Sequence, residues 1–167
     1  DDRRLFGDRS MSFKSGEIND IIVRDLIKNE DTRGWLIELF RKDLIDEQIL
    51  PDMSYISLTY PGIIRGPHEH LEQTDYFCFL SSSFKLVFWD NRKESATSYH
   101  KMSLIIGEND PKIVIVPPGI VHAYKNIGDA PGLVINLPNK LYAGWGKKEK
   151  VDEIRYENDP ESPYKVD

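Results

Sequence analysis

Most of this chain consists of short runs rich in β-branched and aromatic residues, each about as long as a β-strand. Turns marked by proline, glycine, asparagine or aspartate separate the runs, as at Tyr60-Pro61-Gly62 and Pro117-Pro118-Gly119. Such apolar residues suit a pleated, half-buried surface, and glycine and proline supply the backbone angles of turns. The pattern predicts an all-β sandwich or barrel. The runs cover residues 21–23, 35–40, 55–59, 76–80, 84–89, 113–116 and 133–137.

Helix is expected in one place only, from Lys42 to Leu50. Pro51 would end this helix because proline lacks an N–H donor and clashes with the preceding turn. Residues 1–15 are polar and aperiodic, so we expect a flexible tail or a remnant of expression there. Residues 16–167 are then expected to form a single domain, which is long enough to bury a core without disulfides.

Composition excludes several classes of function. The chain has 22 Lys and Arg against 28 Asp and Glu, a formal net charge of -6, and no basic stripe with interleaved aromatics, so nucleic acid is not an expected partner. The single cysteine, Cys78, lies in an apolar run and is expected to be buried filler. No leader or long apolar span is evident, so we expect a cytoplasmic protein that does not bind membranes.

Three of the four histidines fall in two short segments. His68 and His70 end the segment from Gly62 to His70, and His122 lies in the segment from Pro117 to Asn126. Side chains at positions i and i+2 of a strand point the same way, so His68 and His70 can face one cavity. A later strand could bring His122 to the same point. The fourth histidine, His100, has polar neighbours and no motif, and is expected at the surface.

The spacing within these two segments resembles the two motifs of the cupin superfamily. The positions that match the first motif are Gly62, His68, His70 and Asp75, although cupins normally have glutamate at the last position. The second motif is matched residue for residue by Pro117, Gly119, His122 and Asn126. The resemblance implies a cupin double-stranded β-helix, or jelly-roll barrel, with little helix.

Three neutral imidazoles and one carboxylate suit a divalent metal ion such as zinc, manganese, iron or nickel. Its ligands would be His68, His70, Asp75 and His122. Glu72 and Gln73 compete with Asp75 for the fourth ligand position. The alternative is that these side chains form hydrogen bonds across a polar cavity without a metal. Neither a nicotinamide nor a flavin is expected.

A longer resemblance extends from about residue 20 to residue 160. The segments that carry it run from Asp31 to Glu38, Pro61 to His68, Asp90 to Ser95, Pro117 to His122 and Ile154 to Pro160. In this order they are similar to the dTDP-4-dehydrorhamnose 3,5-epimerase family of sugar-nucleotide epimerases and isomerases. The resemblance implies a nucleotide-linked 4-keto-6-deoxy sugar as substrate, proton removal next to its keto group, and a homodimer.

The resemblance also implies roles for single residues. Arg33 and Glu38 match residues that help to bind the nucleotide, often across a dimer, whereas an exposed cross-strand ion pair is their alternative role. Arg65 matches an arginine that contacts the sugar or phosphate, and His68 matches the catalytic base, with His122 beside it in the pocket. Histidine suits a base that works near neutral pH, and arginine suits a diphosphate.

Three positions depart from the family pattern. Asp75 stands where the family has a lysine that polarises the ketone, His70 replaces a glutamine, and Asn136 replaces the tyrosine that donates a proton. Asn136 is kept as a residue that contacts substrate. Tyr142 is predicted as the replacement acid, with Tyr76 and Tyr124 as further phenols. The loss of the tyrosine argues against full 3,5-epimerisation.

A metal could replace the lysine as the group that stabilises negative charge. His68 cannot be both a metal ligand and the base, because a ligand's lone pair is engaged. With a metal, the candidate bases are Glu69, Glu72 and Tyr124. The aspartate that orients the base in the family could only be Asp159 or Asp167. Two rival functions follow: a metal-dependent oxygenase or sugar isomerase, and a cupin that binds nucleotide sugars without turnover.

Overall fold

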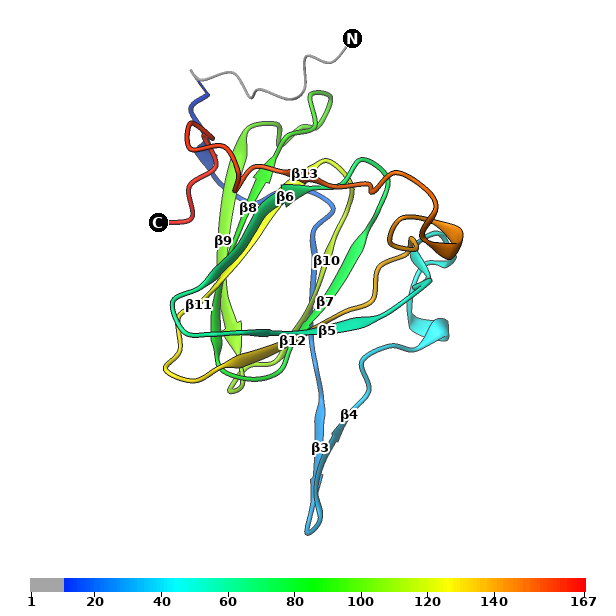
Figure 1. Cartoon of the computed structure of the whole chain (residues 1–167). Helices are drawn as coiled ribbons and strands as arrows, with labels where there is room; N and C mark the ends of the chain where they lie inside the picture. Colours follow the sequence, from blue (N-terminus) through cyan, green and yellow to red (C-terminus); the bar gives the residue numbers. More distant parts are fainter. Residues whose placement is uncertain (1–10) are drawn as a thin grey trace.

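The computed structural model describes residues 11–167, which form two large sheets packed face to face as a barrel (Figure 1). The six-stranded sheet has the order β1-β9-β8-β11-β6-β13, and the five-stranded sheet has the order β2-β10-β7-β12-β5. The strands are β1 (Lys14–Ser15), β2 (Ile22–Asp25), β3 (Lys28–Asp31), β4 (Gly34–Ile37), β5 (Tyr55–Thr59), β6 (Ile64–Glu69), β7 (Asp75–Phe79), β8 (Ser83–Asp90), β9 (His100–Gly107), β10 (Lys112–Val116), β11 (Ile120–Asn126), β12 (Gly132–Asn136) and β13 (Ile154–Arg155). The prediction of an all-β jelly-roll barrel is confirmed.

Alternation along the strands creates an inner core and two outer ones. The inner face of β7 contributes Phe77 and Phe79 to the core between the sheets. Its outer face contributes Tyr76 and Cys78, which pack beneath the segment that follows β4. A third cluster lies on the outside of the six-stranded sheet, where C-terminal residues such as Tyr164 cover it. Cys78 is fully buried and unpaired, as expected.

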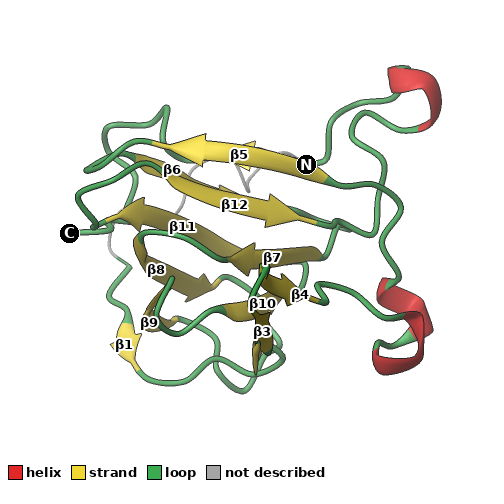
Figure 2. Cartoon of the chain, turned by 90° about the horizontal axis from the view of Figure 1, so that it is seen from below, coloured by secondary structure: helices red, strands yellow, loops and turns green. Residues whose placement is uncertain are grey.

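The helix predicted from Lys42 to Leu50 is wrong. Two short 3-10 turns, η1 (Lys42–Leu44) and η2 (Glu47–Ile49), occupy this segment, and a third turn, η3 (Trp145–Lys147), lies in a later loop; all three lie outside the sheets (Figure 2). Ile45 and Asp46 between the first two turns have extended backbones, so one helix cannot run through them. Packing explains the break, because Ile45 and Ile49 both contact the outer cluster beneath them.

The seven apolar runs did not mark β1, β3, β6, β9, β11 or β13. β3 is largely exposed and forms an isolated hairpin with β4 that projects from the barrel (Figure 1). β9 begins with polar residues, including His100, which is partly buried. The tail predicted for residues 1–15 is wrong at its end, because Lys14 and Ser15 form β1 and pair with β9. Residues 1–10 lie outside the described range. No helical segment among residues 11–167 has the length and hydropathy needed to cross a membrane.

Candidate active site

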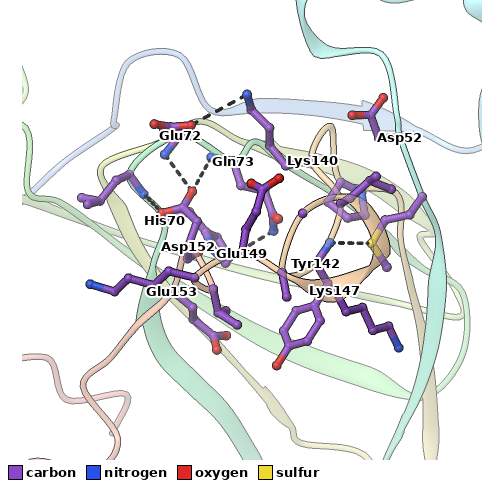
Figure 3. Close-up of a pocket in the computed structure, with 18 of the residues that line it drawn as sticks. Asp52, His70, Glu72, Gln73, Lys140, Tyr142, Lys147, Glu149, Asp152 and Glu153 are labelled. Carbon is purple, nitrogen blue, oxygen red and sulfur yellow. Dashed lines mark hydrogen bonds and ion pairs between the residues drawn. The ribbon is translucent and has the colours of Figure 1, made fainter.

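A cavity of about 840 Å³ opens at one end of the barrel. His68 of β6, His70 just after it, and Tyr55 of β5 line its inner wall. Residues between 138 and 155, most of them in loops, line the rest of the cavity, and several of them carry charges (Figure 3). The cavity therefore has histidines of the barrel on one side and charged residues such as Lys140 and Glu149 on the other, which form its rim.

A bulge in β6 turns Arg65 and His68 toward the same face. His122 of β11 pairs with His68, and Tyr124, two residues later, pairs with Arg65, three residues earlier. The extra residue in β6 reverses the normal alternation between positions three apart. Gly66 makes the bulge possible, because its φ is +87° and a Cβ there would lie 2.6 Å from the carbonyl oxygen of His122.

The structure brings together the four residues predicted as metal ligands. The Nε2 atoms of His70 and His122 each lie 3.1 Å from Oδ2 of Asp75. The ring of His68 lies with its centre 4.5 Å from that of His122. One donor atom from each of the four residues lies within 4.8 Å of the others. These residues come from two sheets, since Asp75 begins β7 and the histidines belong to the β6 and β11 side.

Backbone carbonyls fix the orientation of two of these imidazoles. Nδ1 of His122 donates to the carbonyl of Ile120 over 2.9 Å, and Nδ1 of His70 donates to the carbonyl of Asp152. A carbonyl can only accept, so each Nδ1 carries a hydrogen and each neutral ring has its lone pair on Nε2. Both lone pairs therefore face the region of the Asp75 carboxylate.

This arrangement fits a divalent metal ion. Asp75 Oδ2 and His122 Nε2 are buried, yet neither has a hydrogen-bond partner among residues 11–167. Unpartnered buried polar atoms are costly, and a cation between them would remove that cost. Imidazole nitrogens oriented by carbonyls through their other nitrogen are typical ligands of such ions. The donor set and its surroundings are thus compatible with zinc, manganese, iron or nickel.

The same cluster also has a metal-free description. Burial lowers the pKa of His70, but the Asp75 carboxylate and Asp152 outweigh it and raise the pKa to about 9. Burial raises the pKa of Asp75, but the facing His122 and His70 rings hold it well below its usual value. Burial, with His122 and His70, keeps the pKa of His68 well below its usual value. Without a metal, an ionised Asp75 thus faces a protonated His70, beside a neutral His68.

The second oxygen of Asp75 is held by two amide side chains. Oδ1 accepts hydrogen bonds of 2.8 Å from Nε2 of Gln73 and from Nδ2 of Asn136. Gln73 thus supports Asp75 and does not replace it as a ligand. Glu72 is exposed and lies 3.8 Å from Lys140 on the rim (Figure 3), so it does not compete for the cluster either.

Asp152 organises the cavity edge, although nothing in the sequence marked it. Its carboxylate accepts from the N–H groups of Leu71, Glu72 and Gln73 over 2.8 to 2.9 Å, and its carbonyl orients His70 (Figure 3). This contact spans about 80 residues of sequence, so no local motif could reveal it. The two aspartates considered as candidates to orient the base, Asp159 and Asp167, lie elsewhere.

Asp167 pairs with Lys125, and Asp159 accepts from the N–H of Glu161 in a turn. Neither bonds to His68, so neither candidate orients it in this structure. Glu69, one of the bases considered for a metal mechanism, points out of the cavity, where its carboxylate accepts from Asn91 and Tyr156.

The remaining predicted residues differ in their position. Arg65 is tied to β5, since Nε donates to Oγ1 of Thr59 over 2.9 Å and Nη2 donates to the carbonyl of Leu58 over 2.7 Å. Tyr142 lines the cavity from a loop. Tyr76 faces the outer cluster, where its hydroxyl donates to Leu39.

The predicted nucleotide-binding residues do not line the cavity of their own chain. Arg33 lies at the tip of the β3–β4 hairpin, with 87% of its side chain exposed, and pairs with Asp31 at 2.5 Å. Glu38 is also exposed and lies 3.4 Å from Arg41. They do not pair with each other, so the alternative role, a cross-strand ion pair, is not found.

Comparisons with known proteins agree with this fold. The family model described as dTDP-4-dehydrorhamnose 3,5-epimerase matches residues 15–153. The Probable low-salt glycan biosynthesis epimerase Agl13 of Haloferax volcanii is 42% identical over 126 residues, which cover 75% of this chain and 81% of that protein. The spore coat polysaccharide biosynthesis protein SpsL of Bacillus subtilis is 30% identical over 147 residues, covering 87% of this chain and 93% of that protein.

A solved structure supports the fold independently. The dTDP sugar isomerase from Desulfovibrio desulfuricans G20 superposes with a TM-score of 0.78 at 18% identity, covering 89% of this chain and 92% of that one. The match to the family model extends over most of the domain and includes both histidine segments. The chain therefore belongs to the dTDP-4-dehydrorhamnose 3,5-epimerase family.

Proposed function

We propose that this chain is an epimerase or isomerase that removes a proton next to the keto group of a nucleotide-linked 4-keto-6-deoxy sugar. The observation that carries this proposal is the position of His68. It lines the cavity, and its ring nitrogens make no hydrogen bond to any residue in the described part of the chain, whereas His70 and His122 are each tied to a carbonyl. A ring nitrogen with a free lone pair is what proton abstraction requires.

Neighbouring residues support this chemistry. Arg65 lies on the same face as His68 because of the bulge, and β5 fixes its guanidinium. A fixed guanidinium suits oxygen atoms of the sugar or of a diphosphate. Breaking the C–H bond leaves an electron pair that delocalises onto the keto oxygen, and fixed donors near that oxygen lower the barrier.

A second copy of the chain is part of the proposal. The β3–β4 hairpin leaves the barrel (Figure 1) and exposes Ile27 at 73%, Trp35 at 53% and Leu36 at 62%. Large apolar side chains grouped on one projecting element are typical of an interaction surface. In a homodimer the partner subunit would cover these side chains. The β3–β4 hairpin, here called the arm, would carry Arg33 and Glu38 toward the partner's nucleotide.

A cytoplasmic location is also part of the proposal. Cys78 is buried and unpaired, which fits a reducing compartment.

The proposal is tested by incubating the protein with candidate dTDP-linked 4-keto-6-deoxy sugars in heavy water. Mass spectrometry then reports deuterium at the carbons next to the ketone, and NMR reports any inverted configuration. Exchange is expected with at least one candidate. Binding of the sugar nucleotide with no exchange would instead establish a non-catalytic cupin.

One observation favours a second candidate function, a metal-dependent sugar isomerase or oxygenase. It is the pair of buried, unpartnered atoms, Asp75 Oδ2 and His122 Nε2. His68, His70, His122 and Asp75 would hold the ion, which when bound supplies a Lewis acid for a substrate oxygen. His68 would then be unavailable as the base. Metal analysis of protein purified without a histidine tag, combined with activity before and after chelation, separates the two functions.

A further inference from the structure

The family's tyrosine acid is absent from its expected place, but the structure puts another phenol beside that place. Asn136, which the family resemblance matches to that tyrosine, pairs in register with Tyr55 of the neighbouring strand β5. Nδ2 of Asn136 lies 3.0 Å from the hydroxyl oxygen of Tyr55. Tyr55 lines the cavity together with His68.

Hydrogen bonding around Asn136 fixes which group donates. Its Oδ1 accepts from the N–H of Tyr76 over 2.9 Å, so its nitrogen must be the atom that faces Tyr55. That nitrogen donates one hydrogen to Asp75 and the other to the phenolic oxygen of Tyr55. The Tyr55 hydroxyl is therefore an acceptor in this contact, and its own hydrogen stays free for a molecule in the cavity.

Tyr55 and His68 approach the cavity from opposite sheets. Tyr55 belongs to the five-stranded sheet through β5, and His68 belongs to the six-stranded sheet through β6. Inversion of a carbon requires a base on one face of the sugar and an acid on the other. A sugar ring held between the two sheets would have the base His68 on one face and the acid Tyr55 on the other.

Other phenols near the site fit this role less well. Tyr124 is buried, and its hydroxyl shares a hydrogen bond of 3.3 Å with Ser57. Tyr76 donates outside the barrel to Leu39. Tyr142 lines the cavity, but it sits on a loop and not on a strand. Tyr55 is held by β5 and by Asn136.

We propose that Tyr55 is the catalytic acid of this chain and that Asn136 positions it. The inference rests on the proposed epimerase function. His68 takes the proton from the carbon next to the ketone, and the C–H electron pair forms the enolate. The enolate carbon then takes the Tyr55 proton on the opposite face as the enolate returns to the ketone. Tyr55 is left as a phenolate, stabilised by Asn136 and reprotonated from water, while His68 loses its proton to water.

The experiment compares the wild-type chain with Tyr55→Phe in heavy water, with dTDP-4-keto-6-deoxyglucose as the probe. The matched control is Tyr60→Phe, which removes an exposed hydroxyl just after β5 that does not line the cavity. For Tyr55→Phe we expect deuterium exchange to persist, because His68 and solvent can return a proton to the same face. We expect formation of the inverted sugar to fall about 100-fold or more, the usual scale for removing an acid, with KM little changed. Tyr60→Phe should keep both exchange and inversion at the wild-type rate.

The outcomes separate this inference from the proposed function. Inverted sugar formed by Tyr55→Phe at the wild-type rate, or equal loss of exchange and inversion in a folded variant, would overturn the role of Tyr55 alone. Absence of exchange in the wild type with every candidate sugar would overturn the proposed function, and this inference with it. If Tyr55→Phe does not fold, 3-fluorotyrosine placed at position 55 decides: a catalytic phenol shifts the alkaline limb of the inversion rate to lower pH, and an unmoved limb contradicts the proposal.

Discussion

Nε2 of His122 lies 3.1 Å from Oδ2 of Asp75, and each of these atoms is buried without a hydrogen-bond partner in the described part of the chain. A proton or a metal ion at this point would have different consequences for catalysis. A proton leaves His68 free to act as a base. A metal ion that also binds His68 occupies its lone pair.

Metal removal distinguishes these states. If His68 is the base, protein treated with a chelator and returned to metal-free buffer should keep its exchange activity. Added Zn²⁺ should then inhibit, because it engages His68 together with His70, His122 and Asp75. The measurement is the exchange rate with metal content recorded alongside. Activity that is lost on chelation and restored by one ion per chain would establish the metal-dependent function instead.

Asp152 is predicted to matter although it is remote from the reacting carbon. Asp152→Asn removes the charge that holds three successive N–H groups and weakens the support for His70. We expect the free energy of unfolding to fall by about 1–3 kcal/mol and the exchange rate to fall as well. Asp52→Asn is the control, since Asp52 lines the same cavity but is exposed. Equal effects of both substitutions would contradict a special role for Asp152.

If the β3–β4 arm reaches the site of the partner subunit, two inactive variants should restore activity to each other in a mixed dimer. A chain with Arg33→Ala should lack a nucleotide contact for its partner, and a chain with His68→Asn should lack its own base. When the two chains are coexpressed, a mixed dimer regains one complete site, so about a quarter of all sites should work after random mixing. If Arg33 served its own chain, no site in the mixture would be complete. The readout is exchange activity per chain, compared with each variant alone.

Stability should fall in acid because of a buried carboxylate far from the cavity. Asp90 is fully buried; burial raises its pKa, but hydrogen bonds from Arg92, Thr97 and Ser95 lower it to about 2 from a usual value of 3.8. The folded-state pKa is the lower one, so this group stabilises the fold above about pH 4 and loses that effect as the pH falls toward 2. The contribution at neutral pH is about 2 kcal/mol.

Thermal unfolding across this pH range measures the effect. Asp90→Asn should lower the melting temperature at pH 7 and flatten its dependence on pH between 4 and 2. The control is Asp129→Asn at an exposed turn position, which should leave the pH dependence unchanged. If the melting temperature of Asp90→Asn falls with pH as steeply as that of the wild type, this carboxylate is not the cause of the loss of stability in acid.

Sequence patterns predicted the parts of the fold where burial is nearly continuous along a strand. β7 and β8 bury nearly every residue, and their apolar runs were evident. β3 was missed because it forms an arm that meets little of its own barrel, so no apolar face was required. The segment from Lys42 to Leu50 was misjudged because its apolar residues contact the outer cluster and do not form a helical stripe.

The site was predictable only where chemistry and spacing coincide. His68 and His70 were identified by their i, i+2 spacing and His122 by the second short segment, and the family motif added Asp75. Tyr55 and Asp152 have no such signal. Tyr55 looks like an ordinary strand aromatic, and its role depends on register with Asn136, 81 residues away. Contacts of this kind are set by the barrel's long-range pairing and not by local sequence.

The central claim is that His68 removes a proton next to a sugar ketone. The most direct measurement is deuterium exchange into dTDP-4-keto-6-deoxyglucose by the wild-type chain and by His68→Asn, with His100→Asn outside the cavity as the control. We predict exchange for the wild type and the control, and a loss of about 100- to 10,000-fold for His68→Asn with an unchanged melting temperature. Exchange by His68→Asn at the wild-type rate would contradict the account.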